Sequence, residues 1–305
     1  MKETILDIEN LSVIIKERYL VKNVSLSVDE GEAIALVGGD GSGKTSLLKT
    51  ITHSLPITEG NIFVCGRNVT EKESYSNVGI SLDPPVFFKF QTVFNNLAYL
   101  TKISGNFDKI GILDALKAVG LERRAKVLVL FLSYAEKKLM SLALAFLTKP
   151  KLLLLDEPFK SLSKKQCEIV KSQIKKLQEQ GTAVVISTCT LEDVSDICSK
   201  YYFMENRQIT KTVENTDVVE YLTDKEMAFV EVKYPHYVGK MIIESFNLHV
   251  KLLGNKVVFD TDEDTLAKIV VELSGSKITV FKAGYLNSYA EKVLASLTPY
   301  FKEAK

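Results

Sequence analysis

The chain has 305 residues, of which 46% are hydrophobic and 25% are charged, and its formal net charge is +1. This is the balance of an ordinary globular protein, and a nearly neutral chain has no overall attraction to nucleic acid or to an anionic membrane surface. Its longest apolar runs are far too short to span a bilayer, and its amino terminus lacks the pattern of a signal peptide. The four cysteines show no C-x-x-C spacing, which argues against a zinc site or a disulfide framework and suits a reducing cytosol.

The first eighty or so residues have the pattern of short strands around one glycine-rich loop. Val24, Leu26 and Val28 alternate with polar residues, as in a half-buried strand. Residues 33–37 are continuously apolar, which is typical of a strand buried on both faces of a parallel sheet. The loop that follows leads into a predicted helix at 45–52. The predicted strands of this part are 5–14, 20–28, 33–37, 61–65 and 78–82.

The middle of the chain changes to a helical pattern at about 92–146 and then returns to strands at 151–155 and 183–187, with a helix at 164–179 between them. Short buried strands that alternate with helices predict a parallel sheet covered by helices. After about residue 208 the character changes again.

Residues 227–282 read as strand, helix, strand, strand, helix, strand, and a last helix is expected near 286–301. This order predicts a small α+β unit of the split βαβ kind. The fold class that we expect is therefore α/β, with a small α+β domain at the carboxyl end.

The most informative motif lies between the strand at 33–37 and the helix that follows. It fits the P-loop pattern G-x4-G-K-[ST], in which glycines let backbone N–H groups turn inward around phosphates. Lys44 would contact the β- and γ-phosphates of a nucleotide, and the Thr45 hydroxyl would contact Mg²⁺. The residues expected to bind ATP here are Gly38, Gly39, Asp40, Gly41, Ser42, Gly43, Lys44, Thr45 and Ser46.

A second motif is the apolar strand at 151–155, which ends in Asp156 and Glu157. The first carboxylate can hold Mg²⁺, and the second can polarise a water molecule as a general base. Many buried strands end in acidic residues, so this motif gains its weight from the P-loop beside it. Together the two motifs predict a MgATP site with Asp156 as a metal ligand and Glu157 as a catalytic residue.

With these motifs in place, the chain resembles the ATP-binding subunit of an ABC transporter. Residues 132–138 stand where that family has its L-S-G-G-Q signature, and Ser133 matches the signature serine. Residues 92–97 resemble the segment after the family's Q-loop, and residues 184–189 resemble the strand that carries its switch histidine. The part after residue 215 is similar, more loosely, to the small carboxyl-terminal domain of drug- and bacteriocin-exporter ATPases.

The resemblance implies a P-loop ABC ATPase cassette at 1–212, with a mixed sheet core and a helical subdomain at about 92–146, and a small α+β domain at 216–305. It implies ATP and Mg²⁺ as ligands, ATPase activity, and Ser133 as a contact to nucleotide. It also implies a separate transmembrane permease, a second ABC ATPase subunit, and a location in the cytoplasm at the inner face of the membrane. The substrate would be chosen by the permease, so the sequence does not name it.

The chain departs from the family pattern at the switch and the signature. Cys189 stands where the family has a histidine that contacts the γ-phosphate, and a thiol is a weak hydrogen-bond donor. We include Cys189 with Lys44 and Glu157 as the expected catalytic residues. In the signature, Tyr134 and Ala135 replace two glycines, and the tyrosine either crowds the subunit interface or points away from it.

Smaller departures fall at three other motifs. Asp83 stands at the Q-loop position, where it is expected to be a further Mg²⁺ ligand. Ser163 stands where the D-loop has an aspartate, and Ile15 stands where the family has an adenine-stacking aromatic residue. Tyr19 is a substitute candidate for that stacking, although an exposed tyrosine before a strand is more often simple packing.

In the family, the P-loop and the acidic strand end of one subunit meet the signature of the other subunit at each ATP site. A homodimer of this chain would therefore combine the Cys189 and signature changes in each site, whereas a heterodimer with an intact partner would leave one change per site. Loss of one preorganised donor lowers a rate by about 10²–10³-fold. We therefore expect slow ATPase activity and favour a heterodimer; the alternative is a homodimer in which these changes are tolerated.

Three functions compete on this reading. The first is a transport subunit, an exporter by the resemblance, in which helical residues near 86–99 contact the permease; the alternative for their aromatic side chains is a place in the core. The second is an ATP-gated regulatory or dimerisation subunit with negligible turnover, against which Glu157 speaks. The third is an ATPase acting on ribosomes or DNA, which the single P-loop and the lack of a basic stripe disfavour.

Overall fold

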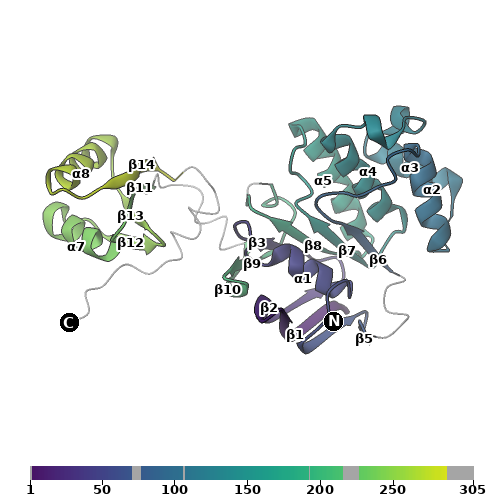
Figure 1. Cartoon of the computed structure of the whole chain (residues 1–305), viewed down its shortest axis with the longest axis horizontal. Coiled ribbons are helices and arrows are strands. Elements are labelled where there is room, and N and C mark those ends of the chain that lie inside the picture. Colours follow the sequence, from purple (N-terminus) through teal and green to yellow (C-terminus); the bar gives the residue numbers. More distant parts are fainter. Residues whose placement is uncertain (1, 71–76, 106, 192, 216–226, 287–305) are drawn as a thin grey trace. The chain divides into compact units, whose positions relative to one another are not determined.

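The computed structural model describes residues 2–70, 77–105, 107–191, 193–215 and 227–286 (Figure 1). These residues form two compact units. The first comprises Met1–Cys189 and Asp193–Asn215, and the second comprises Thr190–Glu192 and Thr216–Lys305.

The first unit contains an antiparallel sheet with the strand order β2-β1-β4-β5. Its strands are β1 (Thr4–Ile15), β2 (Arg18–Asp29), β4 (Glu59–Val64) and β5 (Arg67–Asn68). In β2, the alternating Val24, Leu26 and Val28 are buried, as their period of two predicts for one face of a sheet against the core. The predicted strands at 5–14 and 20–28 are thus confirmed.

The second sheet of this unit is mixed, with the order β10-β9-β3-β8-β7-β6. The pairs β3/β8, β3/β9, β7/β8 and β6/β7 are parallel, and only β9/β10 is antiparallel. Every residue of β3, β7 and β8 is buried, which explains their continuously apolar sequences. The strands are β3 (Ala33–Val37), β6 (Val78–Ser81), β7 (Leu152–Asp156), β8 (Ala183–Thr188), β9 (Lys200–Glu205) and β10 (Gln208–Glu214).

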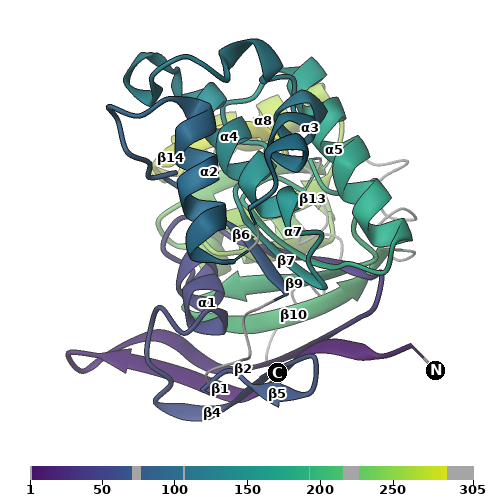
Figure 2. The same ribbon diagram turned by 90° about the vertical axis from the view of Figure 1, so that its right-hand side faces the viewer.

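Helix α1 (Lys44–Ile51) contributes to the core that the two sheets share. Leu47, Leu48 and Ile51 are buried in one cluster with side chains from β1 and β2 on one side and from β3, β7 and β8 on the other. Figure 2 shows α1 between the antiparallel sheet and the mixed sheet. The P-loop helix is therefore fixed by packing against both sheets.

The predicted helical region is confirmed, and serine and threonine caps fix where its helices begin. Thr92 caps α2 (Val93–Ile103), and Ser133 forms a capping box with Glu136 at the start of α4 (Tyr134–Leu147). Ser163 caps α5 (Lys164–Glu179), which has the predicted bounds. The other elements are α3 (Lys109–Ala118) and the short 3-10 turns η1 (Glu122–Arg124) and η2 (Val129–Phe131). Residues 86–90, which were expected to be helical, are not in a helix.

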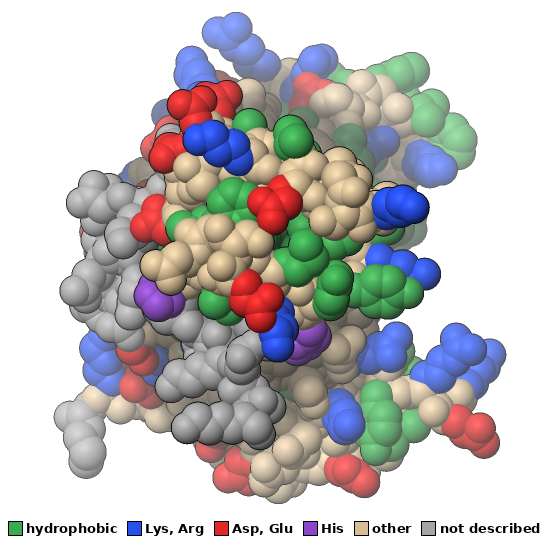
Figure 3. Space-filling view, turned by 90° about the vertical axis from the view of Figure 1, so that its left-hand side faces the viewer, with side chains coloured by type: hydrophobic (Ala, Val, Ile, Leu, Met, Phe, Trp, Pro, Cys, Tyr) green, Lys and Arg blue, Asp and Glu red, His purple; other side chains and the backbone are tan. Residues whose placement is uncertain are grey.

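The second unit has the order predicted for it, from β11 to β14. Its antiparallel sheet has the order β12-β13-β11-β14, and α7 and α8 pack on one face through a core that includes Val230, Ile242 and Ile269. The elements are β11 (Met227–Val232), α7 (Pro235–Phe246), β12 (Val250–Leu253), β13 (Lys256–Asp260), α8 (Glu263–Gly275) and β14 (Val280–Tyr285). Figure 3 shows hydrophobic side chains on the viewed face interspersed with charged ones of both signs. The predicted last helix lies outside the described residues, apart from Leu286.

Candidate functional site

Three adjacent strands of the mixed sheet end beside one another at the site. Val37 pairs with Thr188, and Asp156 pairs with Ser187, so the carboxyl ends of β3, β8 and β7 lie side by side. The P-loop follows β3, Glu157 follows β7, and Cys189 follows β8. Parallel strands place such loops at one edge of a sheet, which is where α/β proteins bind ligands.

The P-loop is shaped by two glycines with backbone angles that other residues rarely adopt. Gly41 has φ of 77° and Gly43 has φ of 108°, and a side chain at Gly43 would lie 2.9 Å from the carbonyl oxygen of Leu20. Lys44 is only 6% exposed, and its ammonium donates to the carbonyl oxygens of Gly38 at 2.5 Å and Gly39 at 3.0 Å. The cation is therefore held inside the loop, where a phosphate would meet it.

Asp156 connects the P-loop helix to the ends of two strands. Its carboxylate is 1% exposed and accepts hydrogen bonds from the Thr45 hydroxyl, at 2.8 and 3.1 Å to its two oxygens, and from the Ser187 hydroxyl. Mg²⁺ in proteins takes one or two carboxylates with hydroxyl, water and phosphate oxygens. The adjacent Thr45 and Asp156 oxygens fit that donor set.

Glu157 and Cys189 contact each other at the mouth of the site. The Cys189 thiol donates to Glu157 Oε1 at 3.1 Å, and its sulfur accepts from the Lys44 ammonium at 3.6 Å. Burial and then the Glu157 carboxylate raise the pKa of the thiol to about 11, so it is neutral at physiological pH. Cys189 thus contacts both the P-loop lysine and Glu157 through a thiol, which is a weak hydrogen-bond donor.

Asp83, which is predicted to bind Mg²⁺, contacts three side chains of its own chain. Its Oδ1 accepts from the Lys138 ammonium at 2.5 Å and from the Tyr134 hydroxyl, and its Oδ2 lies 3.7 Å from the Lys160 ammonium. Burial alone would raise the pKa of Asp83, but these donors and charges outweigh it and lower the pKa. Both oxygens therefore already face cations or donors of the same chain.

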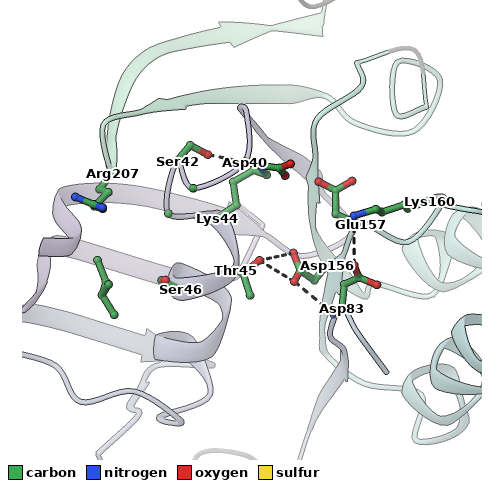
Figure 4. A pocket seen from close by; sticks show the side chains of 13 residues that line it. Asp40, Ser42, Lys44, Thr45, Ser46, Asp83, Asp156, Glu157, Lys160 and Arg207 are labelled. Atoms are coloured by element: carbon green, nitrogen blue, oxygen red, sulfur yellow. Dashed lines mark hydrogen bonds and ion pairs between the residues drawn. The ribbon is translucent and has the colours of Figure 1, made fainter. Parts of the chain in front are cut away.

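A cavity of about 300 Å³ runs along the P-loop, from Asp83 and Asp156 at one end to Arg207 at the other (Figure 4). Arg207 lies across the P-loop from Glu157 and Asp83, on the turn between β9 and β10. Sequence reasoning named neither Arg207 nor Lys160. The lining residues are Leu20, Asp40, Gly41, Ser42, Gly43, Lys44, Thr45, Ser46, Asp83, Asp156, Glu157, Lys160 and Arg207.

Five predicted site residues are not in this lining: Gly38, Gly39, Cys189, Tyr19 and Ser133. Tyr19 is 40% exposed, and the ammonium of Lys22 lies 5.6 Å from the centre of its ring, whereas the neighbouring Leu20 forms the cavity wall. Ser133 is exposed at the start of α4, where its hydroxyl accepts from the backbone N–H of Glu136. A nucleotide contact by Ser133 therefore requires a second subunit.

Comparison with known proteins shows the family of this chain. The profile of the ABC transporter family matches residues 21–160. The chain is 30% identical to the uncharacterized ABC transporter ATP-binding protein YybJ of Bacillus subtilis, over 63% of this chain and 89% of that protein. The chain belongs to the ABC transporter family.

Within this family, the chain is an ATP-binding subunit and an ABC-type ATPase. It is 29% identical to the bacitracin transport ATP-binding protein BcrA of Enterococcus faecalis, over 71% of each chain. Its fold is also that of a solved ATP-binding subunit of an ABC transporter, with a TM-score of 0.65 and 21% identity over 71% of this chain and 92% of that one. Among the described residues, no helix of this ABC subunit is long and apolar enough to cross a membrane.

Proposed function

We propose that this ABC subunit binds MgATP in the cavity along its P-loop and drives export of a substrate through a separate permease. The observation that carries the proposal is the direct hydrogen bond of 2.8 Å between Thr45 and Asp156, which brings the P-loop and the acidic strand end into one site. Lys44 would contact the β- and γ-phosphates, and Glu157 would orient and deprotonate the attacking water. Arg207 would face the nucleoside end of the bound ATP, because it lines the end of the cavity away from Asp156.

Thr45 and Asp156 are the residues that we propose to hold Mg²⁺. The bound ion would neutralise negative charge on the phosphates during hydrolysis. The contacts of Asp83 with Lys138, Tyr134 and Lys160 favour a supporting role for this residue in place of direct ligation.

An exposed apolar surface supports the permease as partner. Val86, Phe88 and Phe90 are 86%, 53% and 80% exposed, which favours an interface over the core for this segment. Phe88 and Tyr99 pack edge to face and line a groove of about 360 Å³ with residues of α2. A permease docked there would hold the chain in the cytoplasm at the inner face of the membrane. The similarity to the bacitracin transport protein supports transport, and export is the direction that we propose for it.

The contacts of Cys189 support slow hydrolysis and a second, different ATPase chain. A neutral thiol beside Glu157 is a weaker donor than an imidazole. Tyr134 is tied to Asp83 in its own chain, so the altered signature also differs in shape from one with two glycines. A heterodimer would leave each of its two sites with one altered motif, whereas a homodimer would leave both motifs altered in each site.

A regulatory subunit with negligible turnover is the second candidate, and the Cys189 thiol is the observation that favours it. The two are separated by ATP binding and steady-state hydrolysis of the purified chain, compared with Lys44→Ala. Measurable turnover that Lys44→Ala abolishes supports the transport subunit. Tight ATP binding without turnover supports the regulatory subunit. Absence of ATP binding in the wild-type chain overturns both.

A further inference from the structure

Lys138 is a fully buried cation next to the site, and no motif assigns it a role. Its side chain is 0% exposed on α4, in the helix that the signature segment opens. A lysine is almost never buried in this way without partners, because an unpaired buried charge is very costly. The partners of Lys138 therefore indicate what it holds in place.

Those partners come from two segments that converge on the metal end of the cavity. The Lys138 ammonium donates to Asp83 Oδ1 at 2.5 Å and to the backbone carbonyl oxygen of Asp156 at 3.0 Å. Asp83 in turn donates its backbone N–H to Asp156 Oδ2 at 3.4 Å. Lys138 thus contacts the backbone of Asp156 directly. It reaches the Asp156 carboxylate only indirectly, through Asp83.

The helix presents this lysine from a fixed position. Tyr134 and Lys138 are four residues apart on α4, so they lie on one face, and both donate to Asp83 Oδ1. The same helix is joined to β6 by a buried hydrogen bond of 2.8 Å between the hydroxyls of Ser141 and Ser81. Asp83 follows β6 directly. Movement of α4 would therefore move the ammonium and Asp83 together.

We infer that Lys138 is a positioning residue that fixes the orientation of Asp156 for the metal ion of bound MgATP. The inference rests on the proposed function, since it concerns the same site. In this inference Asp83 and Lys138 act together. The buried Lys138 ammonium holds the Asp83 carboxylate, and the Asp83 backbone N–H contacts the carboxylate of the metal ligand Asp156. Groups that orient a metal ligand typically contribute about 10–100-fold to metal affinity.

The test measures binding of a fluorescent ATP analogue at increasing Mg²⁺ and, separately, with the metal chelated. Lys138→Met should raise by about tenfold the Mg²⁺ concentration at which Mg²⁺-dependent binding of the analogue is half-maximal. Affinity for the metal-free nucleotide should be unchanged. Lys138→Arg keeps the charge and should recover part of the response. Lys137→Met is the matched control, because Lys137 lies next to Lys138 but is only partly buried, and it should behave as wild type.

A double variant separates positioning from folding. Asp83→Asn alone leaves Lys138 as a buried cation without its carboxylate and should lower the melting temperature, whereas Lys138→Met with Asp83→Asn removes both charges and should restore much of it. The weakened Mg²⁺ response should persist in the double variant. If the response returns to normal there, or if Lys138→Met lowers only the melting temperature, the positioning role is wrong. Wild-type protein that fails to bind ATP at all would instead refute the proposed function.

Discussion

Replacement of Cys189 by histidine should accelerate ATP hydrolysis by this chain. Cys189 lies 3.1 Å from Glu157 and 3.6 Å from the Lys44 ammonium, so a side chain at this position faces both the proposed base and the phosphate-binding cation. A thiol donates weakly, whereas an imidazole donates a full hydrogen bond. Cys189 is exposed at the mouth of the site, which leaves room for the larger ring.

The expected rise in kcat follows from the rate contribution of one hydrogen-bond donor. A single preorganised donor to developing charge changes kcat by about 10²–10³-fold, and the thiol already supplies a weak one. We therefore expect Cys189→His to raise kcat by about 10–100-fold, with little change in the KM for ATP. Phosphate release by the purified chain at saturating MgATP measures this directly.

Two control variants make the result interpretable. Cys189→Ala should hydrolyse ATP within about threefold of the wild-type rate, because little donor strength is lost. Glu157→Gln should abolish turnover in both the wild-type and the Cys189→His backgrounds. A Cys189→His variant no faster than wild type, or a Cys189→Ala variant at least tenfold slower, would refute the reasoning about the weak donor.

Four further results are expected. Lys44→Ala should weaken ATP binding by at least about tenfold in calorimetry, because the cation inside the P-loop is lost; unchanged binding would contradict the role of the loop. Arg207→Gln should weaken ATP binding by up to about tenfold with an unchanged melting temperature, because its guanidinium has no hydrogen bond or ion pair within the part of the chain that the structure describes; equal affinity would place Arg207 outside the nucleotide contacts. Phe90→Ser should reduce the membrane-bound fraction of the chain in cell lysates without changing ATP affinity, since an exposed aromatic is lost from the proposed interface; an undiminished fraction would count against that surface. Wild-type turnover should show no inflection from Cys189 between about pH 6 and 9, because a thiol with a pKa of about 11 stays protonated there, whereas Cys189→His should gain one near pH ~6.5; a wild-type inflection that Cys189→Ala removes would contradict the raised pKa.

Much of the first unit was predictable because its strands are strongly patterned. Residues 33–37 and 152–155 are apolar throughout, and the structure buries all of them in the parallel part of the sheet. The P-loop pattern then fixed where α1 begins, to within one residue. A parallel sheet predicts that the loops after β3, β7 and β8 lie at one edge, but the order β3-β8-β7, which makes the P-loop, Asp156, Glu157 and Cys189 neighbours, comes from the structure.

The roles of Asp83 and Lys138 were not predictable in the same way. Asp83 was interpreted from its position in the Q-loop, but its partner lies 55 residues further along the chain. Lys138 follows Lys137, and two adjacent lysines on a helix usually indicate a solvated face. Lys138 does fall four residues before the buried Leu142, which is the one local signal that it faces inward.

The hairpin of β9 and β10 was also missed, and Arg207 with it. Tyr201, Tyr202 and Phe203 favour a strand, but residues 199–214 lack the glycine that usually marks such a turn. The structure instead turns the chain at Asn206 and Arg207, both with positive φ. A turn of this kind, without glycine, gives a weak signal in a single sequence.

The core around α1 has a consequence for how the protein is made. Ile5, near the start of the chain, and Met204, in β9, belong to the same buried cluster as the P-loop helix. The amino end of the chain leaves the ribosome first, so this cluster is incomplete until Met204 has emerged. The nucleotide site therefore matures late in the synthesis of the first unit, whereas the second unit has a separate core made from residues 228–273, which are synthesised later. Bound ATP can stabilise the first unit only once that late strand is in place.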